Sequence, residues 1–156
     1  MLRKIQSKKL PARGGNFAII ASKYNARFVD AMLRAAQMEL KRAGAKVQIV
    51  RVPGAFEIPV AAAKLARTSS PPLSAIICLG IILRGETTHA QHIGEAVSDA
   101  LMQIQVAREI PVIHEVLLLE NEAQAHKRCL DKKHNRGREA AQTALKMARV
   151  MKSFRG

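Results

Sequence analysis

The stretch SAIICLGIILRGETTHAQHI, from Ser74 to Ile93, decides the fold that we expect for this chain. It opens with an apolar run, Ala75 to Leu79, which has the length and composition of a buried strand. Gly80, a second apolar patch and a polar loop follow, and from His89 onward apolar residues recur at helical spacing. The stretch therefore predicts a strand that leads through a glycine-containing loop into a helix.

The predicted start of this helix has the features of an anion-binding site. Backbone N–H groups in the first turn of a helix have no intrahelical partner, and the helix dipole favours negative charge there. Glu86, Thr87, Thr88 and His89 add a carboxylate, two hydroxyls and an imidazole beside that position. One short segment therefore offers both a phosphate cradle and a group for proton transfer.

The composition indicates one globular domain. A chain of 156 residues with 48% apolar residues can bury a sizeable core, which argues against a disordered chain. No apolar run has the length of a membrane span and no signal peptide is visible, so we expect a cytoplasmic protein without a membrane partner. Cys78 and Cys129 lack metal-type spacing and are expected to be reduced thiols.

The formal net charge of +14 is concentrated at the two ends of the chain. Residues 1–15 form a basic tail or an edge strand, and ten Lys or Arg residues face two acids between positions 127 and 155. Such a balance fits nucleic acid, an anionic substrate or a solvated surface. Aromatic residues make up only 3% of the chain, so the stacking platforms of a single-strand binder are missing.

Strands alternate with helices along the rest of the chain. Besides the opening stretch, the pattern predicts strands at 16–21, 46–52 and 111–119 and helices at 26–43, 56–67, 122–130 and 137–151. This order favours a single-domain three-layer α/β/α sandwich over residues 16–156, with a four-stranded parallel sheet of flavodoxin-like order. Ligands of such sheets bind beyond the carboxyl ends of the strands, here at positions 23–25, 53–57 and 81–89 and at the end of the fourth strand.

Several motifs together resemble the lumazine synthase family. They are Tyr24-Asn25 after the first strand, VPGAFEIP at 52–59, GxxxRGxTxH at 80–89, the QAxxR-type run at 124–128 and an N-[KR]-G-x-E-A-A run at 135–141. The resemblance implies condensation of 5-amino-6-(D-ribitylamino)uracil with 3,4-dihydroxy-2-butanone 4-phosphate, without cofactor or metal. It also implies a pocket between two subunits of a pentamer, and in many members twelve pentamers in a hollow shell.

The resemblance assigns roles by position. His89 is implied for proton transfer, and Arg128 of a second subunit is implied to reach a phosphate cradled by Gly85, Glu86 and Thr87. Tyr24 is implied to stack on the pyrimidinedione, Phe56 and Glu57 to hold the ribityl chain, and 81–83 to offer backbone groups. The residues implied to bind the ribitylaminouracil are Tyr24, Asn25, Ala55, Phe56, Glu57, Ile81, Ile82, Leu83, His114 and Arg136.

Plainer interpretations stand beside these roles. Without the resemblance, Tyr24 is an exposed turn residue, Glu57 a helix-start acid, His89 a structural histidine and Arg128 a surface arginine. A metal face of His89, His92 and Glu95 is disfavoured because no further ligand set is evident.

The chain departs from the family pattern at three positions. Tyr24 stands where Phe or Trp is usual, and Arg136 replaces a common Lys. At His114, a pocket-lining role and an inward-facing strand histidine with a local partner are equally supported.

Three functional classes follow: the enzyme, a cage-forming scaffold without catalysis, and a nucleic-acid-binding shell. We favour the enzyme, with two small-molecule substrates, a homo-oligomer and riboflavin synthase as a further partner. Nucleic acid is not the expected ligand, although the charge of +14 leaves that interpretation open. The N-terminal segment is expected to add to a neighbour's sheet, but Pro11 cannot donate to a strand ladder. The choice between pentamer and shell stays open.

Overall fold

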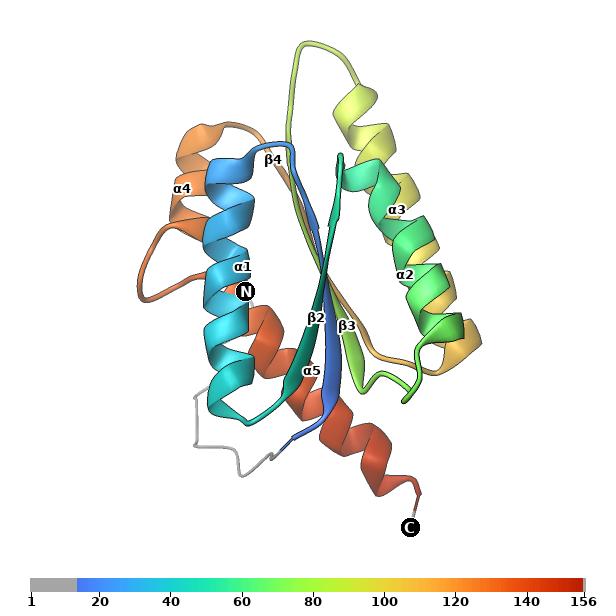
Figure 1. Ribbon diagram of the computed structural model, residues 1–156. Coiled ribbons are helices and arrows are strands. Elements are labelled where there is room, and N and C mark those ends of the chain that lie inside the picture. Colours follow the sequence, from blue (N-terminus) through green and yellow to red (C-terminus); the bar gives the residue numbers. More distant parts are fainter. Residues whose placement is uncertain (1–13, 156) are drawn as a thin grey trace.

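The computed structural model describes residues 14–155, so the expectations for residues 1–13 lie outside the described chain. Four parallel strands form one sheet in the order β2-β1-β3-β4 (Figure 1). The strands are β1 (Asn16–Ser22), β2 (Lys46–Val52), β3 (Ala75–Leu83) and β4 (Val112–Leu119). The expected four-stranded parallel sheet is therefore confirmed.

Helices cover both faces of this sheet. Their bounds are α1 (Ala26–Arg42), η1 (Ala55–Glu57), α2 (Ile58–Thr68), α3 (His89–Arg108), α4 (Glu122–Cys129) and α5 (Arg136–Ser153). Figure 1 shows α1 and α4 on one side and α2 and α3 on the other, and α5 packs in the same core as α1. These three layers confirm the predicted α/β/α sandwich.

The two faces of each central strand supply two separate cores. Ile19 packs in the core beneath α1 and α5, whereas its neighbour Ile20 packs in the core beneath α2 and α3. Parallel sheets covered on both faces need such continuous apolar strands. Val29, Leu33, Ala36 and Leu40 recur at helical spacing along α1 and are all buried, and that helix is followed by Gly44 at a positive φ of 70°. Helix α1 therefore buries one apolar stripe against the sheet.

One strand boundary differs clearly from the prediction. The apolar run of β3 was expected to end at Leu79, but the strand continues to Leu83 and pairs with β4 as far as Leu119. Gly80 lies inside the strand, at a point where neighbouring side chains pack closely against it. A Cβ at this position would meet the side chains of Ile58, Ser22 and Val116 at 3.2–3.3 Å. The glycine thus marks a close approach of neighbouring elements rather than the end of the strand.

The extension of β3 matters for the position of the pocket. The pairing of β1 with β3 ends at Leu79, and β3 then runs on beside β4 alone. The turn after β1, the turn after β2 and the first turn of α3 meet next to this extended end of β3. Within residues 14–155, no helix has the length and apolar content needed to cross a membrane.

Candidate active site

A pocket of about 790 Å³ opens at the carboxyl ends of β1, β2 and β3, close to the loop at the top of Figure 1. Its size is that of a small-molecule site. All but four of the predicted site residues line it. Those that do are Tyr24, Asn25, Ala55, Phe56, Glu57, Ile81, Ile82, Leu83, Gly85, Thr87 and His89.

The turn between β1 and α1 is fixed by bonds to both neighbouring strands. The backbone amide of Tyr24 donates to the Pro53 carbonyl at 3.1 Å, just beyond the end of β2. Asn25 adopts a left-handed conformation with φ of 57°, and its side-chain amide donates to the Ile81 carbonyl at 2.8 Å. Tyr24 as a whole residue is 73% exposed and lines the pocket. The turn therefore holds an aromatic face at the pocket, as a stacking residue requires.

The segment after β2 combines a helix-start acid with a pocket wall. Glu57 Oε2 accepts a hydrogen bond from the Gly54 amide at 3.0 Å, so the plainer interpretation of this residue holds. The same side chain lines the pocket, and its second oxygen takes no hydrogen bond from the described residues. Phe56 beside it is 62% exposed. Glu57 can therefore orient the turn and still accept from a ligand hydroxyl.

The loop after β3 leads directly into α3, as the sequence predicts. The helix begins at His89, and the side chain of its N-cap residue, Thr88, accepts no hydrogen bond from the first turn. Thr87 Oγ1 accepts from the His89 amide at 3.3 Å. Residues 84–89 are all exposed, so an anion can approach the amides of the first turn. The predicted anion site and the imidazole of His89 therefore share one side of the pocket.

A second imidazole that received no catalytic role also lines the pocket. His92 lies one turn after the start of α3, with Nε2 3.3 Å from Thr88 Oγ1. Among residues 14–155, no group of three His, Cys, Asp or Glu side chains is arranged to hold a metal ion. Burial raises the pKa of the Cys78 thiol to about 12, which makes it a poor nucleophile.

His114 lies outside the pocket, on the edge strand β4. Its Nδ1 accepts from the Val116 amide at 3.1 Å, and Nε2 lies 2.8 Å from Ser98 Oγ. Because the Ser98 hydroxyl donates to the Gly94 carbonyl at 2.8 Å, the hydrogen-bond network assigns a neutral ring that donates through Nε2. Burial lowers the pKa of this imidazole. The side chain has the local partner that one interpretation expected, but it is exposed rather than inward-facing.

Arg136 is held by acids in the single chain. Its Nε and Nη2 each donate to Glu115 at 3.0 Å, and its Nη1 donates to Glu139 at 3.1 Å. Glu115 is 7% exposed on β4. Burial raises the pKa of its carboxyl, and the nearby Arg136 and Arg128 guanidinium groups oppose that rise. Glu115 is not among the predicted site residues, although an acid inside the apolar run 112–119 is a signal for a buried partner.

The two remaining predicted phosphate ligands do not line this chain's pocket. Glu86 lies in the loop before α3 and is exposed, but it is not among the residues that line the pocket. Arg128 is exposed on α4, which belongs to the opposite helical layer. Its role at the phosphate of another subunit therefore stays a prediction.

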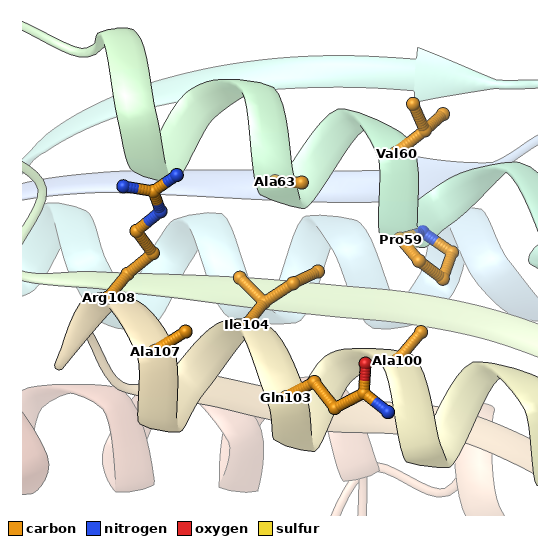
Figure 2. Close-up of a pocket in the computed structure, with 8 residues that line it drawn as sticks. All are labelled: Pro59, Val60, Ala63, Ala100, Gln103, Ile104, Ala107 and Arg108. Atoms are coloured by element: carbon orange, nitrogen blue, oxygen red, sulfur yellow. The ribbon is translucent and has the colours of Figure 1, made fainter.

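Another groove lies between α2 and α3, away from all the predicted residues (Figure 2). It measures about 430 Å³ and is an open apolar trough. Figure 2 shows Arg108 at one end and Pro59 and Val60 at the other. Arg108 is its one titratable lining residue. The groove holds no acid–base pair, so the pocket at the strand ends is the candidate active site.

Comparison with known proteins agrees with this geometry. A family model described as 6,7-dimethyl-8-ribityllumazine synthase matches residues 14–152. Two curated proteins of that name, from Xanthomonas oryzae pv. oryzae strains PXO99A and MAFF 311018, are each 38% identical to this chain over 138 residues. Each match covers 86% of this chain and 88% of the relative. The chain therefore belongs to the 6,7-dimethyl-8-ribityllumazine synthase family.

Proposed function

We propose that the pocket at the strand ends is where this protein condenses 5-amino-6-(D-ribitylamino)uracil with 3,4-dihydroxy-2-butanone 4-phosphate. The activity is that of its family, a transferase step in riboflavin biosynthesis. The observation that carries the proposal is that Tyr24, Glu57 and His89, from three separate segments, line one pocket beside the exposed start of α3. That set suits a flat ring, a polyol and a phosphate.

The ribitylaminouracil lies against the strand ends in this proposal. The exposed Tyr24 ring stacks on the pyrimidinedione, and backbone groups of residues 81–83 meet its polar edge. Asn25 acts by placing the turn, because its amide is already bonded to the Ile81 carbonyl. The free oxygen of Glu57 accepts from ribityl hydroxyls, next to Ala55 and Phe56. Each of these groups is in place in the single chain.

The butanone phosphate lies at the start of α3. Gly85, Glu86 and Thr87 supply the loop, and the first amides of the helix supply donors for the phosphate oxygens. His89 then has the position of a proton-transfer group for imine formation, for loss of phosphate and for closure of the pyrazine ring. Much of the acceleration comes from holding two reactive partners together.

A second copy of the chain completes this site. The pocket is open, and its aromatic residues Tyr24 and Phe56 are largely exposed. We propose that Arg128, His114 and Arg136 reach it from the neighbouring subunit. Arg136 then keeps its bonds to the two acids or exchanges one of them for substrate.

The assembly is a homo-oligomer, a pentamer or twelve pentamers in a shell. Strand β2 lies at one edge of the sheet, where a neighbouring chain can add a strand. The buried free thiols Cys78 and Cys129 fit the proposed cytoplasmic location, where riboflavin synthase would take the product.

The basic surface supports a second candidate function. Helix α5 alone carries five Lys or Arg residues against one acid. A shell with such surfaces could act as a scaffold or hold nucleic acid, with or without catalysis. Nucleic-acid affinity would fall steeply with added salt, whereas turnover would follow the two small substrates.

The deciding experiment is turnover by the purified, assembled protein. We expect 6,7-dimethyl-8-ribityllumazine and inorganic phosphate to appear in equal amounts when both substrates are present, and neither when one is omitted. Absorbance of the product and a phosphate assay give independent readings. An assembled protein that binds both substrates but forms no product would contradict the enzyme and favour the scaffold.

A further inference from the structure

A single side chain spans both ends of the loop that precedes α3. Arg84 comes just before the loop 85–88, and its Nη2 donates to Gln91 Oε1, in the first turn of α3, at 3.2 Å. Its Nη1 pairs with Glu120 at 3.0 Å, and its backbone amide donates to the Leu119 carbonyl at 2.9 Å. The guanidinium therefore ties the two ends of the loop to each other and to the end of β4.

The same contacts continue into α4. The Glu120 amide donates to Gln124 Oε1 at 2.9 Å, and the Gln124 amide donates to Asn121 Oδ1 at 2.9 Å. Gln124 lies four residues before Arg128 on the same helix. The polar chain from Arg84 thus runs between the pocket loop and the helix that carries the predicted phosphate ligand of the neighbouring subunit.

The ion pair between Arg84 and Glu120 contributes little to stability. The Arg84 and Glu120 side chains are 40% and 56% exposed, and exposed ion pairs contribute little to the free energy of unfolding. The loop, however, has few other constraints. Residues 85–88 are exposed, and a Cβ added at Gly85 would meet nothing within 4 Å. The shape of this loop therefore depends on polar contacts at its ends.

We propose that Arg84 is a positioning residue which, with Glu120 and Gln91, holds the loop 85–88 in the shape that binds the substrate phosphate. The inference rests on the proposed function. Arg84 does not line the pocket, and its charge is already matched by Glu120. It acts by keeping the first amides of α3 and the Thr87 hydroxyl in place before the phosphate arrives, which lowers the ordering cost of binding.

The direction in which one substitution changes the affinity for phosphate separates this role from direct phosphate binding. Glu120→Gln removes the partner and leaves the guanidinium charge free. If Arg84 positions the loop, this change weakens phosphate binding, just as Arg84→Gln does. If Arg84 instead gripped the phosphate, freeing its charge would tighten binding. The two hypotheses therefore predict opposite shifts from the same substitution.

The experiment measures the Michaelis constant of each substrate for Arg84→Gln, Glu120→Gln and the double variant. We expect each to raise the constant for the butanone phosphate about two- to fivefold. We expect the constant for the ribitylaminouracil to stay unchanged, and the double variant to be no worse than the worse single one. Arg42→Gln is the control, because Arg42 is the exposed member of an ion pair on α1 whose atoms lie 3.5 Å apart, and it does not line the pocket.

Binding of inorganic phosphate, followed by phosphorus NMR, gives a reading that does not depend on turnover. The same two- to fivefold loss of affinity is expected there for both single variants. A lower constant for Glu120→Gln, equal effects on both substrates, or variants that match the Arg42→Gln control would overturn the inference. Failure of the proposed function would look different, since the wild-type protein itself would form no product.

Discussion

The pocket region and the region around β4 differ in whether their polar side chains already have hydrogen-bond partners within the chain. At the pocket, Tyr24 is mostly exposed and Glu57 keeps an oxygen without a partner among the described residues. Around β4, both ring nitrogens of His114 have partners and Arg136 is bonded to two acids. One region is thus open to ligand and the other is prebuilt. A single chain therefore presents two unlike regions, which we propose to meet where one chain contacts the next.

The difference in packing between the two regions predicts the largest effect. A Cβ at Gly137 would overlap the Met32 backbone where α5 crosses α1, whereas a Cβ at Gly85 would meet nothing within 4 Å. We expect Gly137→Ala to lower the free energy of unfolding by about 3 kcal/mol or more, or to prevent folding, because two backbones cannot separate cheaply. Gly85→Ala should change it by roughly 0.5 kcal/mol at most. Urea denaturation checks both, and equal stability of the two variants would contradict the assigned packing.

The next effect concerns Arg128, which is exposed on the helix that follows β4. If Arg128 grips the phosphate of a neighbouring subunit, Arg128→Ala should raise the Michaelis constant for the butanone phosphate by about tenfold to over a hundredfold. A planar guanidinium can hold two phosphate oxygens, which a lysine cannot do. Lys127→Ala is the matched control and should cost far less. Steady-state kinetics with each substrate varied in turn decides the point, and equal loss for both substrates would remove the assignment.

A smaller effect is expected for His89, in the pocket at the strand ends. His89→Ala should lower the turnover number by about a hundredfold or less while leaving the fold intact, because proximity supplies much of the acceleration. Circular dichroism before and after the change controls for folding. His92→Ala serves as the comparison, since it lines the same pocket one turn later. A turnover number that stays unchanged at saturating substrate would exclude His89 from proton transfer.

The smallest expected effect is a pH dependence of the folding stability that arises from His114. Because burial lowers the pKa of its imidazole below 6.5, the unfolded chain binds more protons than the folded one in the window below that value. Stability should therefore fall as the pH drops below 6.5. His114→Phe should reduce this slope between neutral and mildly acidic pH. Thermal unfolding at several pH values measures it, and an identical slope in both proteins would show that His114 is not the group.

The sequence predicted local features well. Helical periodicity located α1 and its buried stripe, and the strand–loop–helix pattern placed His89 at the first position of α3. Pairs that form across long separations were not predictable. Glu115 and Arg136 are 21 residues apart, and no periodicity links a buried acid to its partner. Gly80 was read as the end of a strand because a glycine that permits close packing looks the same in sequence.

The central claim is that each site combines the pocket of one chain with Arg128 of another. The direct test is to mix equal amounts of His89→Ala and Arg128→Ala chains, unfold and reassemble them together, and measure turnover at low butanone phosphate. Random mixing leaves roughly a quarter of the interfaces with both residues intact, so activity should return to about a quarter of the wild-type rate. Activity no higher than the average of the two variants reassembled separately would show that pocket and arginine belong to one chain, or that Arg128 has no part in the site.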